Sequence, residues 1–361
     1  MSTSSLRRAL CGAATLALLL CPIAAGAAQT DLSQPATKTG PLSRLSDALR
    51  HWLPDAHEEL LQWLEDADDE PPDRETKCLI PGGQSIGVAM MCEGVLVVGT
   101  GDPGTSQSPA RLAGIRSGDR ITHVNGKAVV GADAFSRMIA SGGEISLTVC
   151  RDNRERTVSL QPVPDDGDGA WRIGAWVRDS TAGVGTLTFI DPETGAFGAL
   201  GHAIQDADTC AMLPVAEGLL FDSRVVGIHR GEAGAPGEIV GSFMENRNAI
   251  GDIRCNTACG IFGRCAANYN AADALPIAGS GEVTTGAAQI LTTLDDSGPQ
   301  PYDVEIQRLY DGGSNSRSLM LQVTDPELLA RTGGIVQGMS GSPILQNGKL
   351  VGAVTHVCVF G

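Results

Sequence analysis

The residues best suited to chemistry lie near the C-terminus, in the run Gly338-Met339-Ser340-Gly341-Ser342-Pro343. Glycines around Ser340 let the backbone turn tightly, so that its hydroxyl stays exposed while neighbouring N–H groups converge on one point. An acyl-transfer nucleophile needs such a turn beside an oxyanion hole. Ser342 is the competing nucleophile in the same run.

The segment after this turn reads as a strand, the Asn347-Gly348 turn and a second strand. This order resembles the nucleophile region of chymotrypsin-like peptidases. The resemblance implies that the backbone N–H groups of Gly338 and Ser340 form the oxyanion hole. It also implies that Ser342 takes the position of a small structural residue, which favours Ser340 as the nucleophile.

A serine nucleophile needs a base that accepts its proton, and His202 is the best candidate. His202 follows an apolar strand and Gly201 at a turn, a position from which an imidazole can face a cleft. A hydrogen-bonded structural role for this histidine is the alternative. His229 and His356 are rivals, and His356 could also line the site without being the base.

The elements that must position these residues are short strands. Residues 170–361 are rich in Gly and Val, and β-forming runs alternate with turns, which is typical of a β-barrel or a pair of barrels. The strand-like runs include residues 183–190, 224–228, 238–244, 281–291, 304–309 and 319–323. A sustained helix is expected only near residues 326–331.

Residues 77–163 form a separate module by the same criteria. Its expected elements are strands over 85–90 and 94–98, the Asn125-Gly126 hairpin turn, a helix over 132–140 and closing strands over 145–150 and 156–160. The run PARLAGIRSGDRITHVNGKAV, residues 109–129, resembles a PDZ domain closely.

The PDZ resemblance implies a groove between a strand and a helix that takes an extended peptide by β-addition. The carboxylate-binding loop would lie at Gly82 and Gly83, where backbone N–H groups can converge on an anion. The strand of the groove would contain Ile86, Gly87 and Val88. A purely structural module is the alternative.

The N-terminus carries an export pattern. Arg7 and Arg8 precede an apolar run that ends in small residues by position 28. Residues 1–28 are therefore expected to be a secretory signal, with a retained membrane anchor as the alternative. Either one places the rest of the chain outside the cytoplasm. Residues 29–76 are expected to form one or two amphipathic helices and an acidic, proline-containing linker.

Composition limits the other function classes. The chain has 361 residues, which suggests two domains, and a formal net charge of −16. That charge disfavours nucleic-acid binding, because phosphate contacts need Lys and Arg. Ten cysteines are present, but neither Cys-x-x-Cys pairs nor neighbouring histidines indicate a metal site. We therefore expect no metal and no organic cofactor.

Two longer motifs make the combination specific: FIDPETGAFGALGHAIQDADT at 189–209 and GGIVQGMSGSPILQNGKLVGAVTHV at 333–357. With the export pattern and the PDZ-like module, they resemble the stage IV sporulation protein B (SpoIVB) serine peptidases of endospore-forming bacteria. The resemblance implies that His202 is the general base, Ser340 the nucleophile and Asp325 the carboxylate that orients the imidazole. The residues alone do not choose Asp325 over Asp191, Asp206 or Asp311.

The same resemblance implies a biological role. Such a peptidase is made in the forespore, is exported into the space between the forespore and mother-cell membranes, and processes itself. It also cleaves the extracytoplasmic part of a membrane-bound regulator of an intramembrane protease, and this step triggers sigma-factor activation. Its partners would be this protein substrate and peptide ends at the PDZ groove, with no nucleic acid.

The expected fold is mainly β, with a PDZ module (α+β) followed by a chymotrypsin-like β-barrel serine peptidase domain over 170–361. The sequence stops at Gly361, whereas members of the resembling family continue for some tens of residues. A truncated or naturally short peptidase domain is therefore expected. The rival function is a PDZ peptide-binding scaffold with an inactive, truncated peptidase domain.

Overall fold

The computed structural model describes residues 77–152, 154–243, 249–265, 269–279, 281–310 and 318–357. The predicted signal or anchor (1–28) and the predicted helical segment and linker (29–76) lie outside the described residues. Strands dominate the described part, so the predicted mainly β fold is confirmed. None of the helices in this part is long and apolar enough to span a membrane.

Six strands close into a first barrel, each hydrogen-bonded to the next in the cyclic order β2-β9-β10-β15-β14-β11. They are β2 (Ser85–Thr100), β9 (Ala175–Ile190), β10 (Ala196–Ala199), β11 (Val215–Asp222), β14 (Gly251–Thr257) and β15 (Gly260–Cys265). Closure satisfies the strand edges without neighbouring chains. The buried core of this barrel includes Ile86, Val88, Leu187, Phe197 and Leu220.

Short elements extend the first barrel beside β9. Strand β1 (Cys78–Pro81) pairs with the end of β9 and with β16 (Leu275–Pro276), which follows the 3-10 turn η1 (Ala271–Asp273). Ile277, just after β16, packs with Leu79 and with Leu350 of the second sheet. These contacts join the two halves of the peptidase part.

A second, five-stranded antiparallel sheet follows in the order β19-β18-β17-β20-β21. Its strands are β17 (Gly286–Thr293), β18 (Pro299–Leu309), β19 (Leu319–Val323), β20 (Pro343–Gln346) and β21 (Lys349–Ala353). Helix α6 (Pro326–Thr332) lies between β19 and β20 in the chain, and the hairpin of β12 (Arg224–His229) and β13 (Glu238–Ser242) packs on the sheet through Ile239. Leu328, Met339 and Ile344 belong to the same buried core.

The remaining elements form the compact module. They are α4 (Pro109–Leu112), β3 (Arg120–Val124), β4 (Lys127–Ala128), α5 (Ala132–Ile139), β5 (Ile145–Arg151), β6 (Arg154–Leu160), β7 (Val163–Pro164) and β8 (Trp171–Arg172). The hairpin turn predicted at Asn125-Gly126 is present, with φ of 51° and 75° at these residues. A turn at Ser117 and Gly118 leads to the buried Asp119, whose carboxylate pairs with Arg151 and Arg156.

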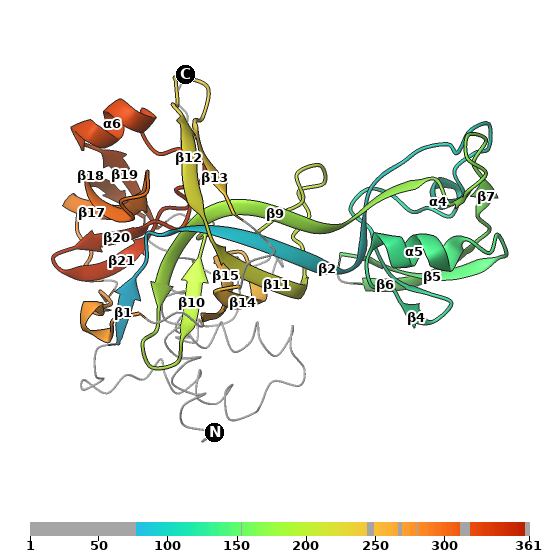
Figure 1. Cartoon of the computed structure of the whole chain (residues 1–361), viewed down its shortest axis with the longest axis horizontal. Helices are drawn as coiled ribbons and strands as arrows, with labels where there is room; N and C mark the ends of the chain where they lie inside the picture. Colours follow the sequence, from blue (N-terminus) through green and yellow to red (C-terminus); the bar gives the residue numbers. More distant parts are fainter. Residues whose placement is uncertain are drawn as a thin grey trace, which may run out of the picture.

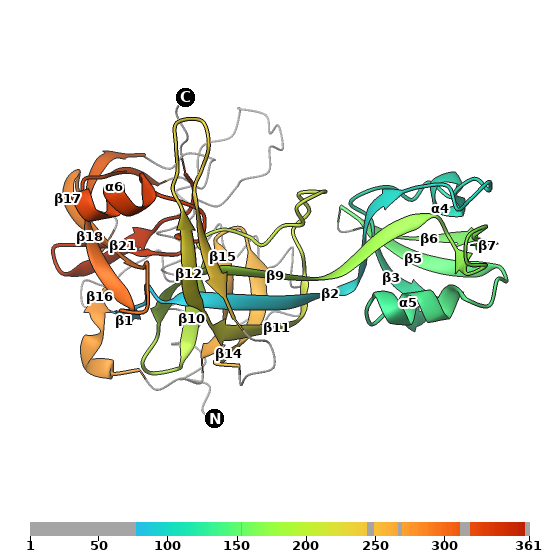
Figure 2. The ribbon, with the colours of Figure 1, turned by 45° about the horizontal axis from the view of Figure 1, so that its top comes forward.

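The module is inserted into the first barrel through two long strands. In β2 and β9, Ser85–Met91 pair with Ser180–Thr186 in the barrel, while Leu96–Thr100 pair with Ala175–Arg178 in the module. Figure 1 shows these strands as two long adjacent ribbons that connect the two parts, and Figure 2 shows the same connection after rotation. The prediction that the module begins at residue 77 is corrected accordingly: residues 78–92 belong to the barrel.

Candidate active site

Ser340 lies in the turn between α6 and β20. Gly338 and Gly341 flank it in the left-handed region, with φ of 94° and 98°. A Cβ on Gly341 would lie 2.1 Å from the Thr186 carbonyl oxygen and 2.6 Å from the Leu200 nitrogen. Glycine is therefore required at position 341 both for its conformation and for close contact with the first barrel.

Strand β9 holds this turn in place. The Thr186 hydroxyl donates to the Gly338 carbonyl at 2.7 Å, and the Thr186 N–H donates to the Ser340 carbonyl at 3.1 Å. On the other side, the Gly341 N–H donates to the Val354 carbonyl at 2.7 Å. Sequence reasoning missed Thr186, because nothing in a Thr-Leu-Thr strand indicates a partner some 150 residues later.

Ser340 and Ser342 differ in accessibility. The Ser340 side chain is half-buried, and its hydroxyl lies 3.5 Å from the Thr355 carbonyl oxygen. Ser342 is completely buried, and its hydroxyl has no hydrogen-bond partner in the described part of the chain. A substrate carbonyl can therefore approach Ser340 but not Ser342.

The backbone N–H groups predicted to form the oxyanion hole are free to bind a substrate oxygen. Within the described residues, the backbone N–H groups of Gly338 and Ser340 donate to no other protein group. The neighbouring Met339, Gly341 and Ser342 N–H groups are all used in the turn. Two free donors one residue apart, in a segment whose other N–H groups are bonded, are suited to an anionic oxygen.

His202 lies on a turn that contacts the Ser340 turn. Leu200 and Gly201 precede it with φ of 70° and 71°, and the Leu200 N–H donates to the Thr186 carbonyl at 3.1 Å. The same Thr186 holds the Ser340 turn, so one residue of β9 joins the two turns. The structure thus brings together the His202 segment of the first barrel and the Ser340 segment of the second sheet, although it has no hydrogen bond between their side chains.

The imidazole of His202 is oriented by a backbone group. Its Nδ1 lies 2.9 Å from the Ala203 carbonyl oxygen, which can only accept, so Nδ1 carries the proton. Nε2 is then the basic nitrogen. The His356 ring lies 6.3 Å from the His202 ring, centroid to centroid, so this rival lines the same site. His229 lies exposed at the end of β12.

The structure gives Asp325 a different partner from the predicted one. Its carboxylate caps α6 by accepting the Leu328 N–H at 2.9 Å, and its other oxygen lies 3.4 Å from the Asp303 nitrogen. It makes no hydrogen bond with His202. The orienting role of Asp325 stays a prediction from the resemblance.

The other candidate carboxylates are also engaged, or lie outside the described part. Asp191 accepts from Lys77 and Thr194, and the buried Asp206 pairs with Arg178. Asp311 lies outside the described residues. No carboxylate within the described ranges bonds the His202 ring.

A cavity of about 750 Å³ opens next to the site, between β19 and the segment after β21. Thr355 and His356 form its rim beside Ser340. Its apolar lining includes Leu319, Leu321, Ile335, Ile344 and Val354. A space of this size and character can hold an apolar side chain of a bound polypeptide.

The predicted peptide-binding loop and strand of the PDZ module are wrong. Ile86, Gly87 and Val88 are paired on both edges, with β9 and with β11, so no peptide can add there. The Gly82 and Gly83 N–H groups donate to the Thr188 and Leu187 carbonyls and are not available to an anion. Residues 86–88 have the sequence pattern of a PDZ strand, but their pairing partners are β9 and β11, about 100 or more residues later in the chain.

The module has its groove elsewhere, between α5 and the first residues of β9. A cavity of about 540 Å³ is lined by Phe135, Ser136 and Ile139 of α5 and by residues 170–177. Among the described strands, only β2 pairs with β9 at Ala175–Arg178, so the edge of β9 that faces α5 is open. The sequence signal for this groove was Ile173-Gly174 directly before a strand, and it was missed. Gly174 has φ of 70°.

The described residues contain no candidate metal-binding site. In the ranges that the structure describes, no group of three or more His, Cys, Asp or Glu side chains is arranged to hold a metal ion. The site therefore consists of a serine, a histidine, free backbone donors and an apolar cavity.

Fold and site together define a serine peptidase, a hydrolase of peptide bonds, that carries a PDZ domain. A sequence model of the SpoIVB peptidase S55 family matches residues 169–360, and a PDZ model matches residues 103–151. The first match covers more than half of the chain, which therefore belongs to the SpoIVB peptidase S55 family.

Among solved structures, the similar chains are PDZ domains. That of the SdrC-like protein from Listeria monocytogenes is 22% identical, with a TM-score of 0.21, over 24% of this chain and 87% of that one. Its counterpart from Listeria innocua is 23% identical, with a TM-score of 0.21, over 24% of this chain and 93% of that one. No curated protein matches the chain.

Proposed function

We propose that this chain is an exported serine endopeptidase of sporulation signalling, with Ser340 as its nucleophile and His202 as its base. The observation that carries the proposal is the contact between the two turns: Thr186 binds both, and the accessible Ser340 lies beside two free N–H donors. Membership of the SpoIVB family supports the reaction class and the link to sporulation.

The geometry supports acyl-enzyme chemistry. The Ser340 hydroxyl attacks the substrate carbonyl while His202 Nε2 accepts its proton, since Nδ1 is protonated towards Ala203. The Gly338 and Ser340 N–H groups stabilise the oxyanion, and the protonated His202 then donates to the leaving amine. Water completes the cycle by hydrolysing the ester on Ser340. Asp325 is retained as the proposed orienting carboxylate, on the resemblance alone.

The proposed substrates are the chain itself and the extracytoplasmic part of a membrane-anchored regulator of an intramembrane protease. The apolar cavity beside Ser340 and the open groove of the module suit two separate segments of one polypeptide. The export pattern at residues 1–28 supports a location in the space between the forespore and mother-cell membranes.

The test uses the chain from residue 29 to 361 and a fluorescent fluorophosphonate, which labels activated serines. We expect labelling and self-cleavage in the wild type and in Ser342→Ala, and neither in Ser340→Ala. His202→Ala should label at least about 100-fold more slowly, because general-base catalysis contributes about that much. If no variant is labelled or cleaved, the chain is a PDZ peptide-binding scaffold and the peptidase proposal fails.

A further inference from the structure

The loop that carries His202 is attached to the strands that lead to the PDZ module. This loop connects β10 to β11 over residues 200–214, and its tip contains Asp206, whose side chain is completely buried. A carboxylate is rarely buried unless it is paired and hydrogen-bonded. The bonds of Asp206 therefore indicate what holds the loop.

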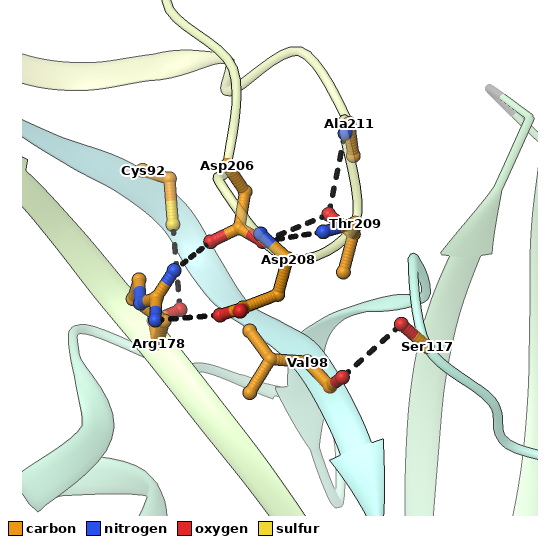
Figure 3. Close-up of polar contacts among 8 residues, drawn as sticks. All are labelled: Cys92, Val98, Ser117, Arg178, Asp206, Asp208, Thr209 and Ala211. Atoms are coloured by element: carbon orange, nitrogen blue, oxygen red, sulfur yellow. Dashed lines mark hydrogen bonds and ion pairs between the residues drawn. The ribbon is translucent and has the colours of Figure 1, made fainter. Parts of the chain in front are cut away.

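Asp206 is bonded from both sides (Figure 3). Within the loop, its Oδ1 accepts from the Thr209 N–H at 2.9 Å, the Thr209 hydroxyl at 3.0 Å and the Asp208 N–H at 3.1 Å. From outside the loop, the Arg178 guanidinium donates to Oδ2 and also to Asp208 Oδ2, the latter at 2.8 Å. Burial opposes ionisation of Asp206, but these bonds outweigh it and hold the pKa of the carboxyl below its ordinary value.

Arg178 occupies a particular place in the fold. It pairs with Leu96 of β2 at the point where β2 and β9 leave the barrel and enter the module. Its carbonyl oxygen lies 3.9 Å from the Cys92 sulfur. It is also the residue directly after Ala175–Val177, which line the module groove. Arg178 thus joins the connecting strands to the loop of the proposed base.

A second clamp holds the base of the loop. The Asn256 side chain accepts the Ile204 N–H and donates to the Ile204 and Leu213 carbonyls, at 2.8, 2.8 and 2.9 Å. Ile204 lies two residues after His202. The loop is therefore held at two points, at its base by β14 and at its tip by β9.

We propose that Arg178 is a positioning residue for His202, acting through the buried Asp206. The inference rests on the proposed function, because it needs His202 to be the base. Without the guanidinium, the buried Asp206 carboxylate loses its counterion and the loop tip rearranges towards water. His202 then leaves the position from which Nε2 can accept the Ser340 proton, without any change in the residues that contact substrate.

The experiment measures saturable fluorophosphonate inactivation of the chain from residue 29, giving the rate constant kinact and the inhibitor constant KI separately. For Arg178→Ala we expect kinact to fall about tenfold to 100-fold, as misplacement of a catalytic group does, with KI unchanged. Arg178→Lys should recover most of the rate, because an ammonium can still pair with Asp206. Arg224→Ala, which removes an exposed ion pair with Asp296, is the matched control and should equal the wild type.

A coupling test covers the case in which Arg178→Ala does not fold. Asp206→Asn keeps the shape of the loop but weakens the same pair, and should lower kinact in the same direction. Where Arg178→Ala folds, its effect and that of Asp206→Asn should not add in the double variant, because both changes remove the same contact.

The outcomes separate the two proposals. If the wild type is labelled, and the folded Arg178→Ala and Asp206→Asn variants react at the wild-type rate, the positioning role is overturned and the proposed function is not. An unlabelled wild type would overturn the proposed function and, with it, this inference.

Discussion

At the residue scale, Thr186 of β9 joins the Ser340 turn to the turn before His202 through three hydrogen bonds. Ser340 and His202 were predicted from glycine spacing and from motifs, but Thr186 was not. Asp325 shows the limit of motif reasoning. An Asp followed by Pro and Glu is also the usual start of a helix, and the structure uses it in that way.

Asp325→Asn tests the two roles of this residue. We expect its melting temperature to stay close to that of the wild type, because Asn caps helices about as well as Asp. Activity then decides the catalytic role: a loss of about 10⁴-fold, as expected for a triad carboxylate, would assign Asp325 to His202. Unchanged activity would restrict Asp325 to capping α6. Asp325→Ala, which should lose about 1 kcal/mol of stability, is the control for the cap.

At the element scale, local patterns located the elements but not their neighbours. The helix predicted over 132–140 is present as α5, and the predicted strand at 183–190 is the second half of β9. The strand at 85–90 was also present, yet it was assigned to the wrong part. Its alternating apolar residues fit a PDZ groove and a barrel wall equally well, and the pairing is decided by β9 and β11, far along the chain.

The relocated groove makes a distinct prediction. Ser136 lies exposed on α5 and lines the cavity beside β9, so Ser136→Tyr should fill the groove. Fluorescence polarisation with a mixture of short peptides that end in apolar residues should show affinity at least about tenfold weaker, because the added ring blocks β-addition. Arg137→Tyr, on the neighbouring exposed position, should bind like the wild type. Equal binding by both variants would contradict the groove assignment.

At the scale of the whole molecule, the module is inserted within the peptidase part, so the two do not follow one another along the chain. Both connections pass through β2 and β9, and the module core around Val95 and Val97 begins within the strand that also builds the barrel core around Ile86 and Val88. No local pattern predicts an insertion, because each half of these strands is a plausible strand by itself.

An insertion can be removed without removing a barrel strand. We expect replacement of residues 97–177 by Asn-Gly to leave a folded, labelling-competent peptidase, because Leu96 and Arg178 are paired and this dipeptide closes antiparallel strands tightly. The variant keeps the Arg178–Asp206 pair and should lose peptide binding. Cooperative thermal unfolding by circular dichroism and fluorophosphonate labelling are the measurements. A variant that does not melt cooperatively would show that the barrel needs the module.

We expect the long strands to set the order of folding events as well. Strand β2 is synthesised well before its partner β9, and about 80 residues separate Leu96 from Arg178. Such a loop is longer than a tight turn by about five doublings of length. Closing it therefore costs about 3 kcal/mol more in chain entropy. A module that has already folded has offset this cost with its own packing, and it holds the two ends together for the barrel strands. The PDZ domain would then act during synthesis as the nucleus on which the catalytic barrel assembles, before it meets any peptide.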